Sequence, residues 1–277
     1  MTFKILFFGD IIGSIGRRGV IAALPDLRAQ YAPDCVIANV ENLAHGSGIT
    51  AKTLLELDAA NIDAYTSGNH VWQNKSGLSC FEDPRWKERL IRPANVDPKR
   101  EGRGFMVLEQ KTADATGKTF TVRVAVTNFL GQLFMKDEAS SPFLSFDRIY
   151  EANKDADIFL VDMHTETTSE KEAFGHYADG RATAVFGTHT HVPTADQKIL
   201  PGGTAYVTDV GRNGALDSVN GFEKVGAIKS FTDSKRTHDI PEHGEVEINC
   251  VLLTVDLETK KAVSLDRIRK IVDISAQ

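Results

Sequence analysis

The amino-acid sequence predicts an α/β protein with mixed β-sheets, on the strength of two observations. Short runs of β-branched and aromatic residues alternate with longer segments of helical period, which is typical of strands joined by helices. Two later pairs of strand-like runs are joined by short polar turns, which favours antiparallel hairpins. The predicted sheets therefore contain strands of both directions.

The alternating part of the chain comes first. Strands are expected at residues 4–8, 35–40 and 64–67, with helices at 13–31 and 50–61 between them. This order is typical of a parallel sheet whose strands are connected by helices.

The rest of the chain adds further strand-like runs and the two hairpins. The isolated runs lie at residues 158–163, 184–186 and 205–210. The hairpins pair residues 105–109 with 120–128 and residues 246–257 with 262–268. The polar stretch 232–244 is the best candidate for a long surface loop, and since no flexible linker is found, the simplest partition is one domain over residues 1–277.

Composition excludes several classes of protein. With 277 residues, 42% hydrophobic and 25% charged, the chain can bury a sizeable core, which excludes disorder and collagen. A net charge of -6 gives no electrostatic reason to expect duplex nucleic-acid binding. Neither a secretion signal nor a membrane-spanning run is expected, and the three separated cysteines favour buried thiols in a reducing compartment. We therefore expect a cytoplasmic protein without a membrane partner.

Polar side chains that can bind metal ions recur directly after apolar strands. In open α/β sheets ligands bind outside the carboxyl ends of the strands, so such residues can converge although they are far apart in sequence. Five strand ends carry eight of them: Asp10, Glu41, Asn42, Asn69, His70, His164, His189 and His191.

Each of these residues also has a purely structural interpretation. Asp10 could form a turn or a helix N-cap, and an isolated His164 is more often a satisfied or surface histidine than a ligand. All five strand ends would have to carry ligand-type residues by chance, however. The joint interpretation as one metal site is therefore favoured.

The donor types indicate the chemistry. Two carboxylates, two carboxamides and four imidazoles without a thiolate suit manganese, iron or zinc and disfavour a structural zinc finger. Two ions roughly 3.5 to 4 Å apart are the standard arrangement for hydrolysing phosphate esters. Such a pair needs a bridging carboxylate, for which Glu41 is our choice.

His70 is expected to act in catalysis instead of binding metal. An imidazole with a pKa near neutrality can protonate a departing alkoxide. The alternative is that His70 only orients a neighbour or binds phosphate as a cation. Trp72, two residues further on, could stack on a nucleobase or pack in the core with equal justification.

The motifs resemble a known family. The runs at residues 9–10 (GD), 68–70 (GNH) and 187–191 (GTHTH), with His164, resemble the motif series of the calcineurin-like metallophosphoesterases. A closer resemblance, to the bacterial YmdB-like branch, covers residue 3 to about residue 270. It is carried by the runs at 40–42 (VEN), 46–50 (GSGIT), 92–95 (RPAN), 168–171 (TSEK) and 204–211 (TAYVTDVG).

Two departures from the wider superfamily matter. Its first motif is Asp-x-His, but position 12 is Ile12, and Glu41 replaces the usual bridging aspartate. The resemblance to the YmdB-like branch implies that Asn42 takes the place of the missing histidine. It implies a first metal held by Asp10, Glu41, Asn42 and His191, and a second held by Glu41, Asn69, His164 and His189.

The resemblance also implies a fold and an activity. The fold is a four-layer sandwich of two mixed sheets flanked by helices. The activity is a phosphodiesterase with two divalent ions, iron or manganese before zinc, in which a metal-bridging hydroxide attacks small nucleotide diesters. The substrates implied are 2',3'-cyclic mononucleotides, with 3',5'-cyclic ones as a further option.

Alternatives and open points remain. The same metal site could serve a phosphomonoesterase, and a nucleotide-sensing regulatory protein with little turnover is the option outside enzymes. The resemblance implies an indirect link to RNA turnover. The native metal, the physiological substrate and the oligomeric state, with a homo-oligomer as one option, stay open.

Overall fold

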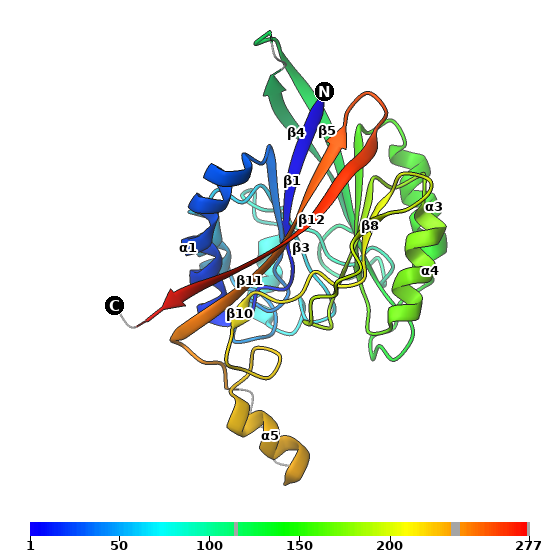
Figure 1. Cartoon of the computed structure of the whole chain (residues 1–277). Coiled ribbons are helices and arrows are strands. Elements are labelled where there is room, and N and C mark those ends of the chain that lie inside the picture. The colour runs from blue at the N-terminus through cyan, green and yellow to red at the C-terminus, as the bar shows by residue number, and fades with distance from the viewer. Residues whose placement is uncertain (114–115, 234–238, 276–277) are drawn as a thin grey trace.

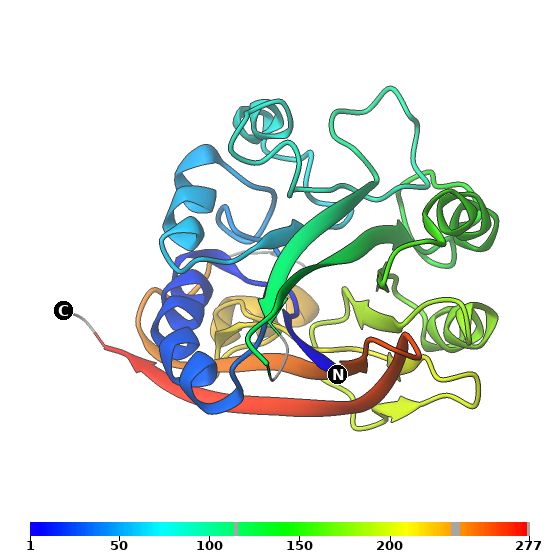
Figure 2. The same ribbon diagram turned by 90° about the horizontal axis from the view of Figure 1, so that it is seen from above.

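Two six-stranded sheets lie face to face between two pairs of helices (Figure 1). The computed structural model describes residues 1–113, 116–233 and 239–275. Seen from above, the layers run from α1 (Gly13–Tyr31) and α2 (Ala51–Asp58) through the sheets to α3 (Pro142–Asn153) and α4 (Thr168–Ala178) (Figure 2). This is the predicted four-layer sandwich.

The first sheet is mixed around its central strand, β1. That strand pairs parallel with β2 and antiparallel with β11, and the order is β10-β11-β1-β2-β3 with β12 on β11. The strands are β1 (Thr2–Phe8), β2 (Cys35–Asn39), β3 (Ala64–Thr66), β10 (Gly214–Ala215), β11 (Gly244–Asp256) and β12 (Lys261–Ile274).

The second sheet has four parallel strands flanked by antiparallel edges. Its order is β4-β5-β6-β7-β9-β8, and the run from β5 to β9 is parallel. The strands are β4 (Phe105–Ala113), β5 (Thr119–Leu130), β6 (Ile158–His164), β7 (Ala184–Thr188), β8 (Lys198–Ile199) and β9 (Ala205–Val207).

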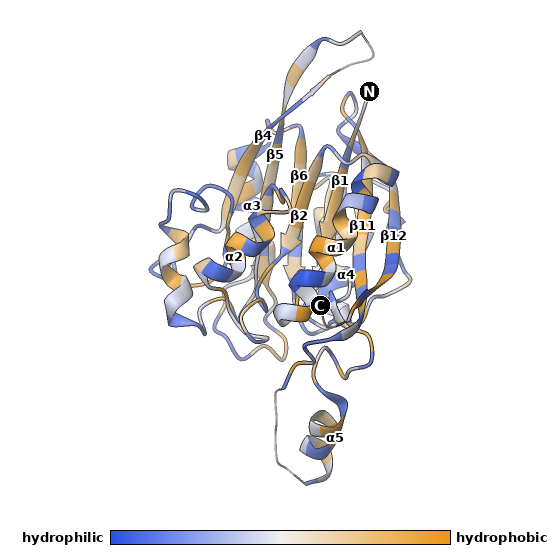
Figure 3. Cartoon of the chain, turned by 90° about the vertical axis from the view of Figure 1, so that its left-hand side faces the viewer, coloured by the Kyte–Doolittle hydropathy of each residue, from blue (hydrophilic) through white to orange (hydrophobic). Residues whose placement is uncertain are grey.

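Three apolar cores hold the layers together. Phe7 of β1 and Phe186 of β7 meet between the sheets, with ring centroids 4.9 Å apart. A second core packs α1 and α2 on the first sheet, and a third, which includes Phe146 and Phe174, packs α3 and α4 on the second. The central strands are accordingly the most hydrophobic parts of the ribbon (Figure 3).

Most predicted elements are confirmed. The helix expected at 13–31 is α1, both hairpins form, and the three cysteines are free and buried. Residues 50–61 give a shorter helix, α2, which Thr50 caps by accepting from the amide of Thr53. None of the helices in the described residues is both long and apolar enough to span a membrane.

Among the expected boundaries, those of one strand and one loop are wrong. The strand expected at 205–210 ends at Val207, because side chains of the preceding loop take the next backbone donors: Asp196 binds the amide of Thr208, and Thr194 that of Asp209. The loop expected at 232–244 begins after α5 (Lys224–Thr232), a helix that projects from the body (Figures 1 and 3), and residues 234–238 of it lie outside the described part.

Candidate metal centre

The candidate ligands lie where strands of both sheets end. Asp10 follows β1, Glu41 and Asn42 follow β2, and Asn69 follows β3, all in the first sheet. In the second sheet, His164 is the last residue of β6, and His189 and His191 follow β7. Side chains separated by up to 181 positions thus meet at one seam between the two sheets.

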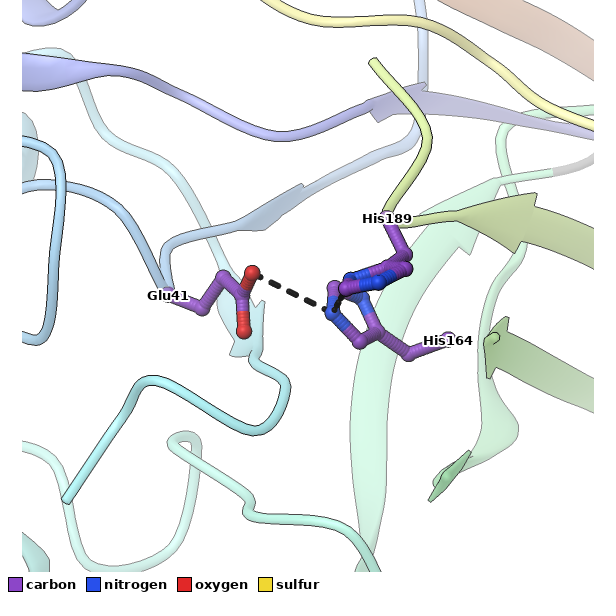
Figure 4. A group of neighbouring side chains, drawn as sticks. All are labelled: Glu41, His164 and His189. Atoms are coloured by element: carbon purple, nitrogen blue, oxygen red, sulfur yellow. Dashed lines mark hydrogen bonds and ion pairs between the residues drawn. The ribbon is translucent and has the colours of Figure 1, made fainter. Parts of the chain in front are cut away.

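The ligand atoms form two overlapping groups. Glu41, His164 and His189 make one, and Asp10, Glu41 and His191 make the other, with ligand atoms within 4.8 Å of one another in each group. Figure 4 shows the side chains of the first group pointing toward one another, with Oε1 of Glu41 3.1 Å from Nε2 of His164. Glu41 belongs to both groups, which is the placement that a bridging carboxylate requires.

The two asparagines complete the cluster. Nδ2 of Asn42 lies 3.1 Å from Oε1 of Glu41 and 3.3 Å from Nε2 of His191. Oδ1 of Asn69 lies 3.3 Å from Nε2 of His164. The structure therefore brings together all seven residues predicted as ligands, with Asn42 beside His191 and Asn69 beside His164. Their binding of metal remains a prediction.

The cluster has the features of a cation site. Asp10 and Glu41 are both fully buried, and Oδ1 of Asp10 has no hydrogen-bond partner among the described residues. Buried carboxylates are unfavourable unless a positive charge balances them. Gly68 leaves the necessary room, because a Cβ there would lie 2.1 Å from Oε2 of Glu41 and 2.3 Å from Nε2 of His164. The residues present fit a pair of divalent ions.

Mutual charges set the ionisation of the cluster. Burial lowers the pKa of His164, but the charge and hydrogen bond of Glu41 outweigh burial and raise this pKa to about 9. Burial raises the pKa of Glu41, yet His164 brings it well below its usual value. Burial also lowers the pKa of His189 to about 3 and that of His191 to about 4, so both imidazoles are neutral and able to bind a cation at neutral pH.

His70 lies beside the cluster with its Nδ1 side turned inward. Its amide donates to Oε2 of Glu41 over 3.1 Å, and Nδ1 lies 3.2 Å from Oδ1 of Asn42 and 3.4 Å from Oε1 of Glu41. With Nδ1 facing these partners, Nε2 is the ring nitrogen through which His70 would reach a substrate. This geometry suits the predicted role as a general acid.

The histidine loop after β7 has an unusual backbone. His189 has φ 91° and His191 has φ 66°, conformations that cost free energy in residues other than glycine. Two aspartates hold the loop: the amide of His189 donates to Asp10 over 3.1 Å, and the amide and hydroxyl of Thr190 donate to Oδ2 of Asp209 over 3.1 and 2.6 Å. Backbone strain at this site is thus balanced by hydrogen bonds to buried carboxylates.

Sequence reasoning missed Asp162, which lies inside β6. It accepts from the hydroxyl of Thr188 over 2.6 Å, and that hydroxyl lies 2.8 Å from Nδ1 of His164. It also accepts from Nδ2 of Asn39 in the first sheet over 2.9 Å. An acidic residue within an apolar strand was the available signal. Asp162 positions His164 through Thr188 and links the two sheets.

Two further side chains have clear positions. Glu166, also missed, lies 3.2 Å from Nε2 of His189, where it can orient the ring. Trp72, by contrast, packs against the core between the first sheet and helices α1 and α2, while the Arg100 guanidinium covers its ring at 4.2 Å. The core-packing interpretation of Trp72 is therefore favoured.

Known proteins resemble this chain along its whole length. The family model described as "YmdB-like protein" matches residues 6–268. A Bacillus subtilis (strain 168) protein named 2',3'-cyclic-nucleotide 2'-phosphodiesterase is 41% identical over 266 residues, which is 96% of each chain.

Two solved structures extend the comparison. The crystal structure of a novel phosphatase from Mycoplasma pneumoniae superposes with a TM-score of 0.88 at 36% identity, over 99% of this chain and 95% of that one. The calcineurin-like phosphoesterase YfkN of B. subtilis, at 13% identity, has a TM-score of 0.61 over 99% of this chain and 91% of that one, which shows a shared fold.

Proposed function

The chain belongs to the YmdB-like family and has the calcineurin-like phosphoesterase fold, and on this basis we propose that it is a metal-dependent phosphodiesterase of small nucleotides. One observation carries the proposal: two ligand groups share a single buried carboxylate, that of Glu41. A site of this type suits phosphate esters, whose charged oxygens need positive charge on more than one side.

The chain's own side chains define where two cations would be held. The first cation would be held by Asp10, Asn42 and His191, and the second by Asn69, His164 and His189. Glu41 would contact both cations. Two divalent cations, when bound there, supply Lewis-acid stabilisation of phosphate charge and lower the pKa of water. The donor set suits iron, manganese or zinc, and of these we propose iron or manganese first, as the family resemblance implies.

The remaining steps of catalysis belong to His70 and its surroundings. Nε2 of His70 would hold the proton that the leaving ester oxygen requires, since Nδ1 faces Asn42 and Glu41. Such proton transfer typically contributes about 10²- to 10⁴-fold to the rate. Glu166 and Asp162 keep the two histidines of the second group in position.

The substrate class follows from the relatives and from the space at the site. The B. subtilis relative is named for 2',3'-cyclic nucleotides. A cavity of about 490 Å³ beside His70 and His189 falls within the range of small-ligand sites, about 300–1,000 Å³. We therefore propose 2',3'-cyclic mononucleotides as substrates, with 3',5'-cyclic ones to be tested beside them.

The decisive experiment compares a diester with a monoester. Protein loaded with manganese or iron is given bis-p-nitrophenyl phosphate and p-nitrophenyl phosphate at matched concentration, followed by the cyclic nucleotides. Faster turnover of the diester supports the proposal, whereas preference for the monoester makes the protein a phosphatase. Tight binding of cyclic nucleotide without product over hours makes it a sensor.

A further inference from the structure

The cavity beside the metal centre has one wall that catalysis does not explain. His70, His189, Asn69 and Glu166 line the side of the proposed reaction. The other side is formed by the segment 134–137, between β5 and α3. This segment brings a phenylalanine and a methionine to a cavity that is otherwise polar.

Phe134 is exposed in a way that packing does not account for. Its side chain is 87% exposed, the highest value among the large hydrophobic residues described, and the adjacent Leu133 is exposed as well. Its φ of 60° lies in the left-handed region, which is unfavourable for a residue with a bulky side chain. A conformation that costs free energy and keeps an aromatic ring in water is a reason to look for a ligand.

The base of this loop is anchored to α4. The carboxylate of Glu170, which is buried, accepts from the amide of Gln132 over 2.9 Å and from that of Leu133 over 3.3 Å. The side chain of Gln132 donates to the carbonyl of Ala139 over 2.9 Å, which ties the two ends of the loop together. These contacts hold the backbone that carries Phe134.

We propose that Phe134, with Met135 beside it, is a stacking surface for the base of a nucleotide whose phosphate lies at the metal centre. The inference rests on the proposed function and adds to it that the protein recognises the base of the substrate. An aromatic ring stacks on any base without reading its edge, so the surface would accept different bases. Trp72 is not an alternative stacking residue, because it does not line this cavity and the Arg100 guanidinium covers its ring.

The test separates base from phosphate. In metal-loaded enzyme, Phe134→Ala is compared on 2',3'-cyclic adenosine monophosphate and on a methyl riboside 2',3'-cyclic phosphate, which has no base. We expect KM for the nucleotide to rise by about fivefold or more, with kcat within about twofold, while KM for the base-free compound stays unchanged. Phe134→Trp should keep the wild-type KM.

Phe231 supplies a matched control. It is 86% exposed on α5 and does not line the cavity, so Phe231→Ala should leave both KM values unchanged. An unchanged nucleotide KM in Phe134→Ala, or an equal rise for both substrates, overturns the stacking surface.

Binding measurements distinguish failure of the stacking proposal from failure of the proposed function. If the wild type hydrolyses no diester, calorimetry with adenosine 3'-monophosphate and ribose 5-phosphate still tests the loop. The stacking surface is supported if Phe134→Ala weakens binding of the nucleotide by about fivefold or more and leaves binding of the sugar phosphate unchanged. Equal affinity of wild type and variant for the nucleotide overturns it.

Discussion

Nζ of Lys171 lies 2.7 Å from Oδ2 of Asp209, and both side chains are buried. The same carboxylate accepts from the amide and hydroxyl of Thr190 and, through Oδ1, from the amide of Gly211 over 2.8 Å. One ion pair thus joins α4 to the loop that carries His189 and His191. The sequence motifs at 168–171 and 204–211 meet in this contact.

Removing the acid should destabilise the protein. Asp209→Ala leaves the Lys171 charge buried without its partner, a change that typically costs about 3–5 kcal/mol of unfolding free energy. Urea unfolding measures the loss. The exposed pair of Lys224 and Asp217 gives the control, since Asp217→Asn should change stability by less than about 1 kcal/mol. Equal effects of the two substitutions would show that Asp209 has no special structural role.

Replacing His70 should separate catalysis from metal binding. We expect His70→Ala to lower kcat by about 10²- to 10⁴-fold because the leaving oxygen loses its proton donor. Metal content, measured by mass spectrometry of the purified protein, should stay at the wild-type level. His176→Ala, at an exposed histidine of α4, is the control for activity. Loss of metal in the His70 variant would make this residue a ligand.

Replacing Glu41 should remove metal together with activity, since this carboxylate faces both ligand groups. Asp10→Ala is expected to behave in the same way. Glu88→Ala removes an exposed carboxylate, paired with Arg103, and should keep both metal and turnover. Wild-type metal content in Glu41→Ala would show that another residue is the bridge.

Asp162 should make stability depend on pH in metal-free protein. Burial raises its pKa from 3.8 to about 6, so between these values the folded state holds a proton that the unfolded state has lost. The contribution of this group to stability is therefore full below about pH 4 and falls as pH rises to 6, by on the order of 3 kcal/mol.

The substitution Asp162→Asn removes this titration but keeps the size and shape of the side chain. Relative to wild type, its unfolding free energy should improve steadily from about pH 4 to about pH 7 in urea titrations. Asp217→Asn, at an exposed acid, should show a constant difference over the same range. A constant difference for Asp162→Asn as well would contradict the raised pKa.

The sequence predicted the strands, the helices and the mixed sheets because apolar runs and hairpin turns are local signals, whereas the four-layer arrangement was implied by the family resemblance. Residues such as Asp10 and His164 could be identified because each stands at the end of such a run. The two-residue strands β8 and β10 carry no comparable local pattern, since their pairing depends on distant partners. Asp162 was hidden within a strand, and the position of Phe134 depends on an anchor, Glu170, that is 36 positions away.

The seam on which the cluster lies has a consequence for the whole molecule. Asp10 and Glu41 come from one sheet, and His164 and His189 come from the other. A cation held between them would therefore cross-link the two sheets. Removing the cations with a chelator would lower the unfolding free energy of the whole domain, because a ligand that binds only the folded state stabilises that state. Resistance to heat would then report how fully the centre is loaded.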